Sequence, residues 1–446
     1  MTLPRFYPFY LVFLFLFISL FNDFISAVVN FLGLTALVPL AGLLEKALFS
    51  LIIISSFLLI IKKKFNFYVF DKRILATFSA VLLIGFLSCL SLNHDYSIFI
   101  LQTILTFQGV ILFFAIINLE LSFDDIVKVE RYFVIFIKVI LFISLVNIIF
   151  PTFFTSFWLS YKDVELSLYR GDGGRAALMS IFPHPGLLGW FSSLSALFFF
   201  SKLLLNKFKK VDILYFLFSL IVLLMTFRRK SILAFVIVCF IAILLFSNKT
   251  SSKFIRGGSI FAIFAFISIL FLDEIMVLFN DTYSKYVLAS GENEMPRIIL
   301  AQAGYEIAKD YFPLGVAPGY FGSWMSSVNY SYIYDLYDVS GYWGLSKESP
   351  MFLNDTYWPM IIAEFGFLGG ALTLFMWYFF YSKSITFLKS GIVNNKNYFS
   401  CFILLALLEL LIESIATPSL SRSPQITIIM TLLALILNKE RIWKNV

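Results

Sequence analysis

The sequence predicts an all-α polytopic membrane protein with about 12 transmembrane helices and one large extracytoplasmic loop that contains short helices. Three observations predict this fold class. Hydrophobic residues make up 60% of the 446 residues and charged residues only 14%, whereas soluble domains carry about 25% charged residues. The mean hydropathy is +0.90. The apolar residues form runs of about 16 to 24, the length that crosses a hydrocarbon core roughly 30 Å thick.

Residues 273–355 form the longest stretch that is not apolar enough to cross a membrane, and they divide the chain into three parts. Residues 1–272 hold nine predicted transmembrane helices, and residues 356–446 hold three. A membrane protein that keeps about eighty residues in one loop is expected to place its specific chemistry there. We therefore look for functional residues in and around this loop.

The first stretch, residues 6–44, is apolar with a polar break at Asn22-Asp23, so it forms either one broken crossing or two short ones. The count of twelve takes it as one, followed by a second run at 46–61. Arg5 precedes the first run and no small-residue cleavage site follows, so we expect an uncleaved first span. The later predicted spans are 74–92, 98–118, 132–150, 186–205, 213–227, 231–246, 258–272, 356–382, 398–415 and 425–437.

The basic residues predict the orientation of the chain. With the N-terminus in the cytoplasm, about 21 Lys and Arg fall on the cytoplasmic side and about 12 in the much longer outside loops, as the positive-inside rule requires. Both termini are then cytoplasmic and the large loop faces outward. The net charge of +7 is therefore a topology signal, and we expect the lipid bilayer rather than nucleic acid as a partner.

Signatures of soluble enzymes are absent from the sequence. It contains no Gly-x4-Gly-Lys-Ser/Thr phosphate loop and no Cys/His metal cluster, and its only histidines are His94 and His184. We therefore expect no cofactor and no metal. Its three cysteines each lie inside an apolar span and are interpreted as small core residues.

Several cations are predicted on the outer side, where they oppose the positive-inside rule. Arg228-Arg229-Lys230 make up nearly a whole turn between two spans, Arg170 and Arg175 flank a Gly-rich run, and Arg422 lies in the short turn 417–424. Each of them can be a helix-end anchor that reaches to lipid headgroups. Taken together on one membrane face, they suggest a binding site for an anion.

Within the large loop, Pro296 is expected to open a helix, because proline is favoured at the first helical position. Leu300, Ala303, Ile307 and Tyr311 recur at spacings of three and four, which predicts an apolar stripe that lies on the membrane domain. A polar stripe that includes Glu306 faces the other way. The helix should end before Pro313, where a Pro/Gly-rich turn follows.

Arginines, carboxylates and aromatic residues therefore occur together on one face of the membrane. Arginine binds phosphate with two hydrogen bonds and keeps its charge, aromatic rings pack on sugars, and carboxylates hold or deprotonate hydroxyl groups. The combination suits a glycan carried on a lipid pyrophosphate. Alternatively, the Tyr and Trp residues form an interfacial belt and the acids keep the loop soluble.

Three segments resemble the O-antigen polymerase and ligase superfamily. Residues 170–189, with Phe182-Pro183-His184-Pro185-Gly186, are similar to the segment that opens the central helices of that superfamily. Residues 226–231 resemble its short outside turn with an arginine followed by serine. Arg297 followed by Pro313-Leu314-Gly315-Val316-Ala317-Pro318-Gly319 is similar to its large-loop pattern of arginine, helix and Pro/Gly-rich turn.

The sequence departs from the ligase branch of this superfamily at one position. That branch usually has a histidine just before the span that closes the large loop, where this sequence has Asn354-Asp355-Thr356. The departure favours a Wzy-type polymerase, in which the corresponding span begins with a polar stretch and a Glu-x-Gly like Glu364-Phe365-Gly366.

The resemblance implies an integral-membrane, metal-independent glycosyltransferase of the bacterial cytoplasmic (inner) membrane, with its active site on the periplasmic side. It would polymerise undecaprenyl-pyrophosphate-linked oligosaccharide repeats into an O-antigen or related surface polysaccharide, with a chain-length regulator and a flippase as further partners. The expected site residues, which bind the pyrophosphate or the substrate, or act on the acceptor, are Arg170, Arg175, Arg228, Arg229, Arg297, Tyr320, Asp355, Glu364, His184 and Glu306.

Two other functions fit the same sequence. A ligase that attaches finished polysaccharide to a lipid or protein acceptor shares the fold and differs in its acceptor. A lipid-linked oligosaccharide flippase would carry ionisable groups through the middle of the membrane. Here the charges cluster at one predicted surface, although Lys138, Glu409 and Glu413 lie in predicted spans. We expect these three to pair within the helix bundle.

Overall fold

The computed structural model describes residues 7–64, 67–161, 177–205, 207–246, 295–395 and 397–444, and every regular element in these residues is a helix. The predicted span 258–272 and the predicted site residues Arg170 and Arg175 lie outside the described residues, as does the part of the predicted loop before residue 295.

Seven of the described helices are long and apolar enough to cross a membrane, so the chain is an all-α membrane protein. Shorter or less apolar helices complete the described bundle. The seven long helices are α1 (Tyr7–Phe31), α2 (Val38–Lys62), α3 (Lys72–Ser91), α4 (Tyr96–Ile117), α5 (Phe123–Ile149), α8 (Pro185–Leu204) and α16 (Trp358–Asn395). The others are α6 (Pro151–Tyr161), α9 (Lys210–Met225), α10 (Arg229–Phe246), α17 (Tyr398–Glu413) and α18 (Gln425–Lys444).

The boundaries of the first two helices differ from the sequence prediction. Helix α1 continues through Asn22-Asp23, and the break follows at residues 32–37, where Gly33 has φ +78° and Pro39 lies in the first turn of α2. Helix α2 then continues through Glu45, so the predicted division between the runs 6–44 and 46–61 was wrong. The polar residue is accommodated because Ser19 on α1 donates a 2.7 Å hydrogen bond to the Glu45 carboxylate.

Helix α5 begins earlier than its apolar run suggests, since a capping box starts it. The Ser122 hydroxyl accepts from the Asp125 amide at 3.1 Å, while the Asp125 carboxylate accepts from the Ser122 amide at 3.2 Å. The polar first turn is thus stabilised by its own side chains. Helix α6, which follows α5 directly, was not predicted.

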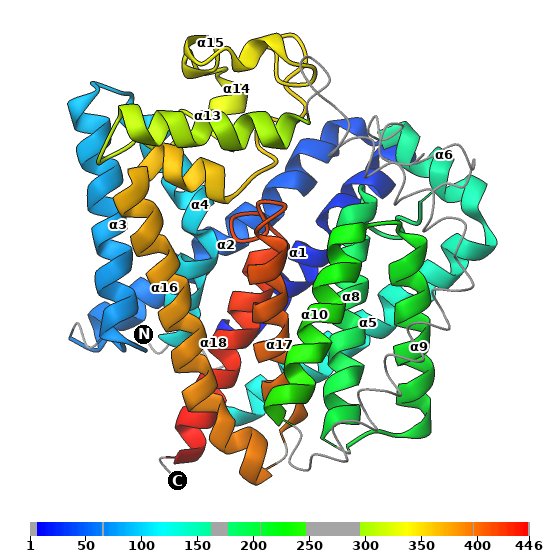
Figure 1. Cartoon of the computed structure of the whole chain (residues 1–446). Coiled ribbons are helices and arrows are strands. Elements are labelled where there is room, and N and C mark those ends of the chain that lie inside the picture. Colours follow the sequence, from blue (N-terminus) through cyan, green and yellow to red (C-terminus); the bar gives the residue numbers. More distant parts are fainter. Residues whose placement is uncertain are drawn as a thin grey trace.

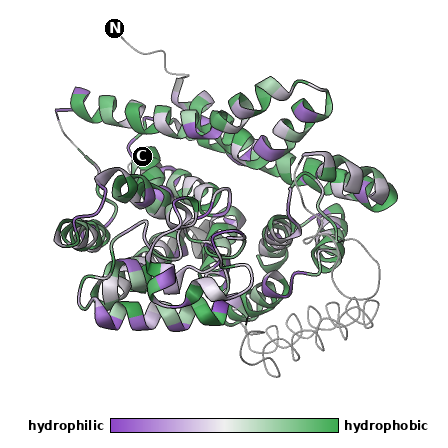
Figure 2. Cartoon of the chain, turned by 90° about the horizontal axis from the view of Figure 1, so that it is seen from above, coloured by the Kyte–Doolittle hydropathy of each residue, from purple (hydrophilic) through white to green (hydrophobic). Residues whose placement is uncertain are grey.

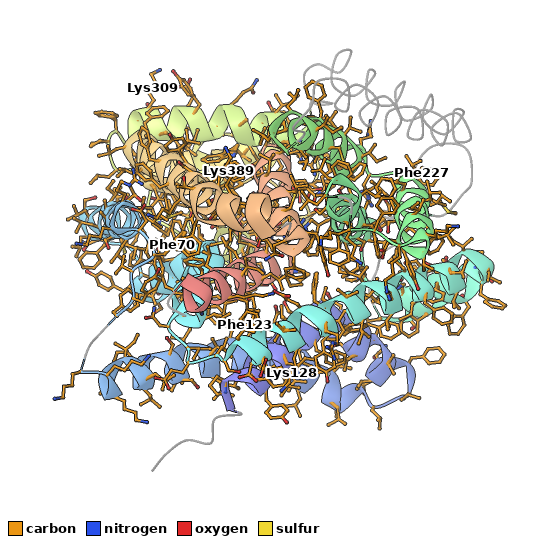
Figure 3. All side chains as sticks on the ribbon, turned by 90° about the horizontal axis from the view of Figure 1, so that it is seen from below. Phe70, Phe123, Lys128, Phe227, Lys309 and Lys389 are labelled. Carbon is orange, nitrogen blue, oxygen red and sulfur yellow. The ribbon has the colours of Figure 1, made fainter. Side chains whose placement is uncertain are left out.

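Helices α8 and α18 are the most completely buried, and α17 packs against both of them and against α10. Figure 3, seen from the end that carries Lys128 and Lys389, shows side chains filling the space between the helices. The cysteines Cys89, Cys239 and Cys401 are buried and free. This agrees with their interpretation as small core residues.

Short elements cover one end of the bundle. They are α13 (Pro296–Asp310), α14 (Trp324–Val328), α15 (Ile333–Leu336) and the 3-10 helix η4 (Val339–Gly341). Figure 1 shows α13 lying across the ends of the upright helices, with both chain termini at the opposite end. The view onto the covered end (Figure 2) shows hydrophilic residues interspersed along these elements. We call residues 295–357 the cap segment.

Candidate functional site

Helix α13 holds Arg297 in its first turn. As the sequence predicts, Pro296 opens this helix, and Leu300 and Ile307 are fully buried. The helix packs against α16, with Gly304 so close to Pro359 that an added Cβ would lie 3.0 Å from its carbonyl oxygen. Arg297 is thereby fixed at the end of a buried helix, with its guanidinium half-exposed.

Arg297 forms the central ion pair of the site. One of its terminal nitrogens donates to Asp355 Oδ2 at 2.8 Å, and the two side chains are 39% and 22% exposed. The residue next to this carboxylate, Asn354, accepts from Arg422 through its backbone and side-chain oxygens, each at 3.4 Å. Three residues that lie far apart in the sequence, in the cap segment and in the turn between α17 and α18, therefore meet at one place.

The first turn of α10 brings two more cations to this place. Arg228 is only 6% exposed. The Nζ of Lys230 donates to the Thr417 hydroxyl at 3.1 Å and lies 4.0 Å from Glu413 Oε2. Arg228, Arg297 and Arg422 lie close enough for their charges to act on Lys230. Arg229, the first residue of α10, is half-buried beside them.

We call Arg228, Lys230, Arg297 and Arg422 the cation cluster. Its four positive charges come from α10, α13 and the α17–α18 turn, and the contacts described above give it two carboxylates, Asp355 and Glu413. Among the described residues, four cations thus meet two carboxylates. In addition, α10 and α13 both begin beside it, and a helix N-terminus favours negative charge. Arginine forks beside two helix N-termini suit a phosphate or pyrophosphate group.

His184 acts as the N-cap of α8. Its Nδ1 accepts a 2.9 Å hydrogen bond from the Gly186 amide, and the side chain is exposed. The same end of α8 packs on the turn before α10, since a Cβ on Gly189 would lie 3.2 Å from Arg228 Cβ. The structure thus brings the 182–189 segment next to the cation cluster, and gives the histidine a structural task there.

Glu364 and Tyr320 come together, but away from the ionic contacts of the cation cluster. Glu364 is fully buried, and its Oε1 accepts from the amides of Gly319, Tyr320 and Phe321 at 2.7, 3.1 and 3.3 Å. This carboxylate therefore holds the backbone of residues 319–321 in place, and no part of it is exposed to solvent. Asp355 is therefore the better placed of the two carboxylates proposed to act on an acceptor.

The Pro/Gly-rich turn at 313–321, which we call the wedge, inserts between α3, α4 and α16. The Val316 amide donates to the Ala363 carbonyl at 2.9 Å, and the Ser88 hydroxyl donates to the Gly315 carbonyl at 2.6 Å. At Gly366 the helix α16 departs from helical geometry, with φ 68°, and an added Cβ would lie 2.1 Å from the Pro313 carbonyl oxygen. The wedge thus packs directly against the kink in α16, and the close approach depends on glycine at position 366.

Tyr320 belongs to the wedge and packs on the α3–α4 turn. Its ring stacks on His94 with centroids 3.6 Å apart, and its hydroxyl accepts from the Asp95 amide at 3.1 Å. Burial raises the pKa of the Tyr320 phenol. Burial also lowers the pKa of His94, which a hydrogen bond to the backbone of Val316 partly opposes. Tyr320 therefore contributes to packing at the wedge.

The remaining predicted residues separate into exposed and buried groups. Glu306 is exposed and pairs with Lys309 at 3.2 Å, nine positions along α13 from Arg297, which is roughly 13 Å at 1.5 Å per residue. It is not brought to the cation cluster. Among the loop aromatics, Tyr334 is fully buried and donates to or accepts from Ser326 at 2.7 Å, whereas Trp324, Tyr332 and Trp343 are exposed.

Three residues of the site were not among those predicted: Lys230, Arg422 and Glu413. The first two were recognised only as outside cations that oppose the positive-inside rule. Glu413 was recognised only as an acid within a span. The signal that finds all three is their position at helix ends that are predicted to lie on the same side of the membrane, because such residues meet once the helices pack.

The comparisons with known proteins add no relative to this description. No family model matches the chain. A search of curated proteins also finds no match.

Proposed function

We propose that this protein is a membrane glycosyltransferase that polymerises undecaprenyl-pyrophosphate-linked oligosaccharide repeats into a surface polysaccharide. The observation that carries the proposal is the cation cluster, with Asp355 beside it, under a segment that does not cross the membrane. A pyrophosphate on a lipid carrier is an anion that is held at a membrane surface, which is where these cations lie. The sequence resemblance to the O-antigen polymerase and ligase superfamily supports the same function.

The proposal includes the finer topology. About twelve helices cross the bacterial inner membrane, both termini are cytoplasmic, and the cap segment faces the periplasm. Both termini lie at the end opposite the cap segment (Figure 1), which supports an even number of crossings. The basic residues of the connectors at that end support its cytoplasmic location.

In the proposed reaction, the hydroxyl of an acceptor sugar attacks the anomeric carbon of the donor chain. The bond from that carbon to the pyrophosphate oxygen breaks, and its electron pair leaves with the pyrophosphate. Arg297, Arg422, Arg228 and Lys230 stabilise the charge that develops on the leaving group. Asp355 is held by Arg297 at 2.8 Å, so an incoming pyrophosphate competes for that arginine. The freed carboxylate then orients the acceptor hydroxyl and takes up the proton that this hydroxyl loses as it attacks.

The experiment that tests this function compares the surface-polysaccharide ladder of cells lacking the gene with that of the complemented strain, while lipid-linked intermediates are extracted in parallel. A polymerase predicts that long chains vanish and a single repeat still reaches the surface. Accumulation of long lipid-linked chains that are not attached to their acceptor indicates a ligase instead. A flippase predicts that single lipid-linked repeats accumulate on the cytoplasmic face. An unchanged ladder contradicts the glycan assignment.

A further inference from the structure

Two buried carboxylates lie at the inner edge of the cation cluster. Glu409 and Glu413 are four residues apart on α17, so they share one face of the helix about 6 Å apart along its axis. They are 0% and 1% exposed. Glu413 ends the helix at the site, and Glu409 lies one turn further into the bundle.

The two carboxylates have very different partners. Glu413 accepts from the Ser231 hydroxyl and, at 3.1 Å, from the Gln425 side-chain amide, and it has Lys230 at 4.0 Å. Neither oxygen of Glu409 has a partner at full hydrogen-bond geometry among the described residues, and the hydroxyl that acts on it is that of Ser193. We expected the acids within the predicted spans to pair within the bundle. Of these two residues, Glu413 has a cation beside it among the described residues and Glu409 does not.

Within the described residues, the cation that acts on Glu409 is Lys230, which is also the counter-ion of Glu413. From α8, Glu409 faces the Ser193 hydroxyl, and from α10 it faces the Cys239 thiol and, beyond Glu413, Lys230. The groups that α16 and α18 bring to this end of α17 are Trp358 and Gln425, neither of which titrates. An ionised carboxylate without a partner is strongly disfavoured in such an interior.

Charge balance leads to the same result. Within the described residues one ammonium group, Lys230, faces this pair of carboxylates. If both were ionised, two like charges would lie one helical turn apart in a dry interior. Two carboxylates in this situation retain one proton between them, and the proton belongs to the pair. We infer that Glu409 and Glu413 form a proton-binding pair that holds one proton, and that this proton is linked to anion binding by the cation cluster.

Lys230 provides the linkage. It is the counter-ion of Glu413 and also a member of the cation cluster, so an anion that attracts Lys230 leaves the pair with less positive charge nearby. The pair then binds its proton more tightly. Because such coupling is reciprocal, the proton on the pair strengthens anion binding. The linkage rests on the proposed anion site, whereas the proton itself does not.

The proton can be observed directly in the purified full-length protein in lipid nanodiscs. Infrared spectroscopy detects the carbonyl stretch of a protonated carboxylic acid, which shifts on exchange into heavy water. We expect this band in the wild type at neutral pH, its loss in Glu409→Gln, and its retention with a shift in Glu409→Asp. The control Glu306→Gln changes an exposed carboxylate and should leave the band unchanged. A spectrum that does not differ between the wild type and Glu409→Gln overturns the inference.

The linkage is measured by calorimetry with inorganic pyrophosphate in two buffers of different ionisation enthalpy. Wild-type protein should take up protons on binding, and Glu409→Gln should bind with no proton uptake. Wild-type binding without proton uptake, at mildly acidic and mildly alkaline pH alike, contradicts the linkage even if the variant does not fold. If the infrared band depends on Glu409 but pyrophosphate does not bind, the pair holds its proton as inferred and the proposed anion site is wrong.

Discussion

The cap segment meets the helix bundle at two places that differ in kind. At the wedge, backbone hydrogen bonds and close glycine contacts are buried between α3, α4 and α16, and Oε1 of Glu364 accepts from three amides. At the cation cluster, the contacts join half-exposed charged side chains, such as Arg297 and Asp355 at 39% and 22% exposure. The first contact is made mainly by backbone groups and closely packed glycines. The second brings four cations and two carboxylates together among the described residues.

This difference indicates how the two contacts divide their tasks. Buried and fully satisfied hydrogen bonds are costly to break, so the wedge fixes the position of the cap segment. Ion pairs at half-exposed positions contribute little stability and exchange partners readily, so the cluster can release Asp355 when an anion arrives. Substitutions at the wedge should therefore reduce stability, and substitutions at the cluster should reduce activity.

The largest expected effect is that of Gly366→Val at the wedge. A side chain there meets the Pro313 carbonyl, whose oxygen would lie 2.1 Å from the Cβ, and valine disfavours φ 68°. We expect loss of folded protein, measured as membrane-inserted protein that resists aggregation on detergent extraction. The control is Gly341→Ala, where an added Cβ has no neighbour within 4 Å. Normal levels of Gly366→Val would contradict the described wedge.

Arg297→Ala should abolish chain growth while the amount of folded protein stays normal. Removing one group that stabilises a developing charge typically costs on the order of 100-fold or more in rate. Arg297→Lys keeps the charge but loses the planar fork, so it should also be strongly impaired. Lys309→Ala, on the same helix with its side chain paired to exposed Glu306, is the matched control. Polysaccharide ladders and protein levels are compared, and wild-type chain length in Arg297→Ala would remove this residue from the site.

Glu364→Ala should destabilise the protein by about 3 kcal/mol or more, because three buried N–H groups lose their acceptor. Glu364→Gln retains a carbonyl oxygen and should lose less. Thermal unfolding of the purified variants in nanodiscs measures both. A Glu364→Ala protein with unchanged stability and no activity would instead make Glu364 part of the chemistry.

The smallest expected effect is a pH dependence of stability from His94. Burial lowers its pKa from the ordinary value of 6.5, so below that value the unfolded chain binds more protons than the folded protein. The contribution of His94 to stability is therefore complete above about pH 6.5 and is lost as the pH falls below it. His94→Phe keeps the stacking on Tyr320 and should remove this part of the pH profile of thermal unfolding. Parallel profiles for the two proteins would exclude His94 as its source.

Particular residues show how far the sequence predicts the structure. The apolar stripe of α13 was predicted from Leu300, Ala303 and Ile307, and all three are buried, because a periodic pattern is a local property. The break at Asn22-Asp23 was wrong, since a polar pair inside a long helix is tolerated wherever neighbouring helices or lipid headgroups accommodate it. The sequence flagged both Glu364 and Tyr320, but their mutual contact depends on a turn that joins two distant segments.

The sequence by itself determined that this is an all-α membrane protein and that a helix begins at Pro296. These features follow from composition and local periodicity, which need no tertiary contact. Only the tertiary structure decided which charged residues meet. Arg297, Arg422 and Lys230 come from three separate parts of the chain, and their distances depend on how α10, α13 and α17 pack. The same packing left Glu409 without a partner at full hydrogen-bond geometry among the described residues, one turn from Glu413.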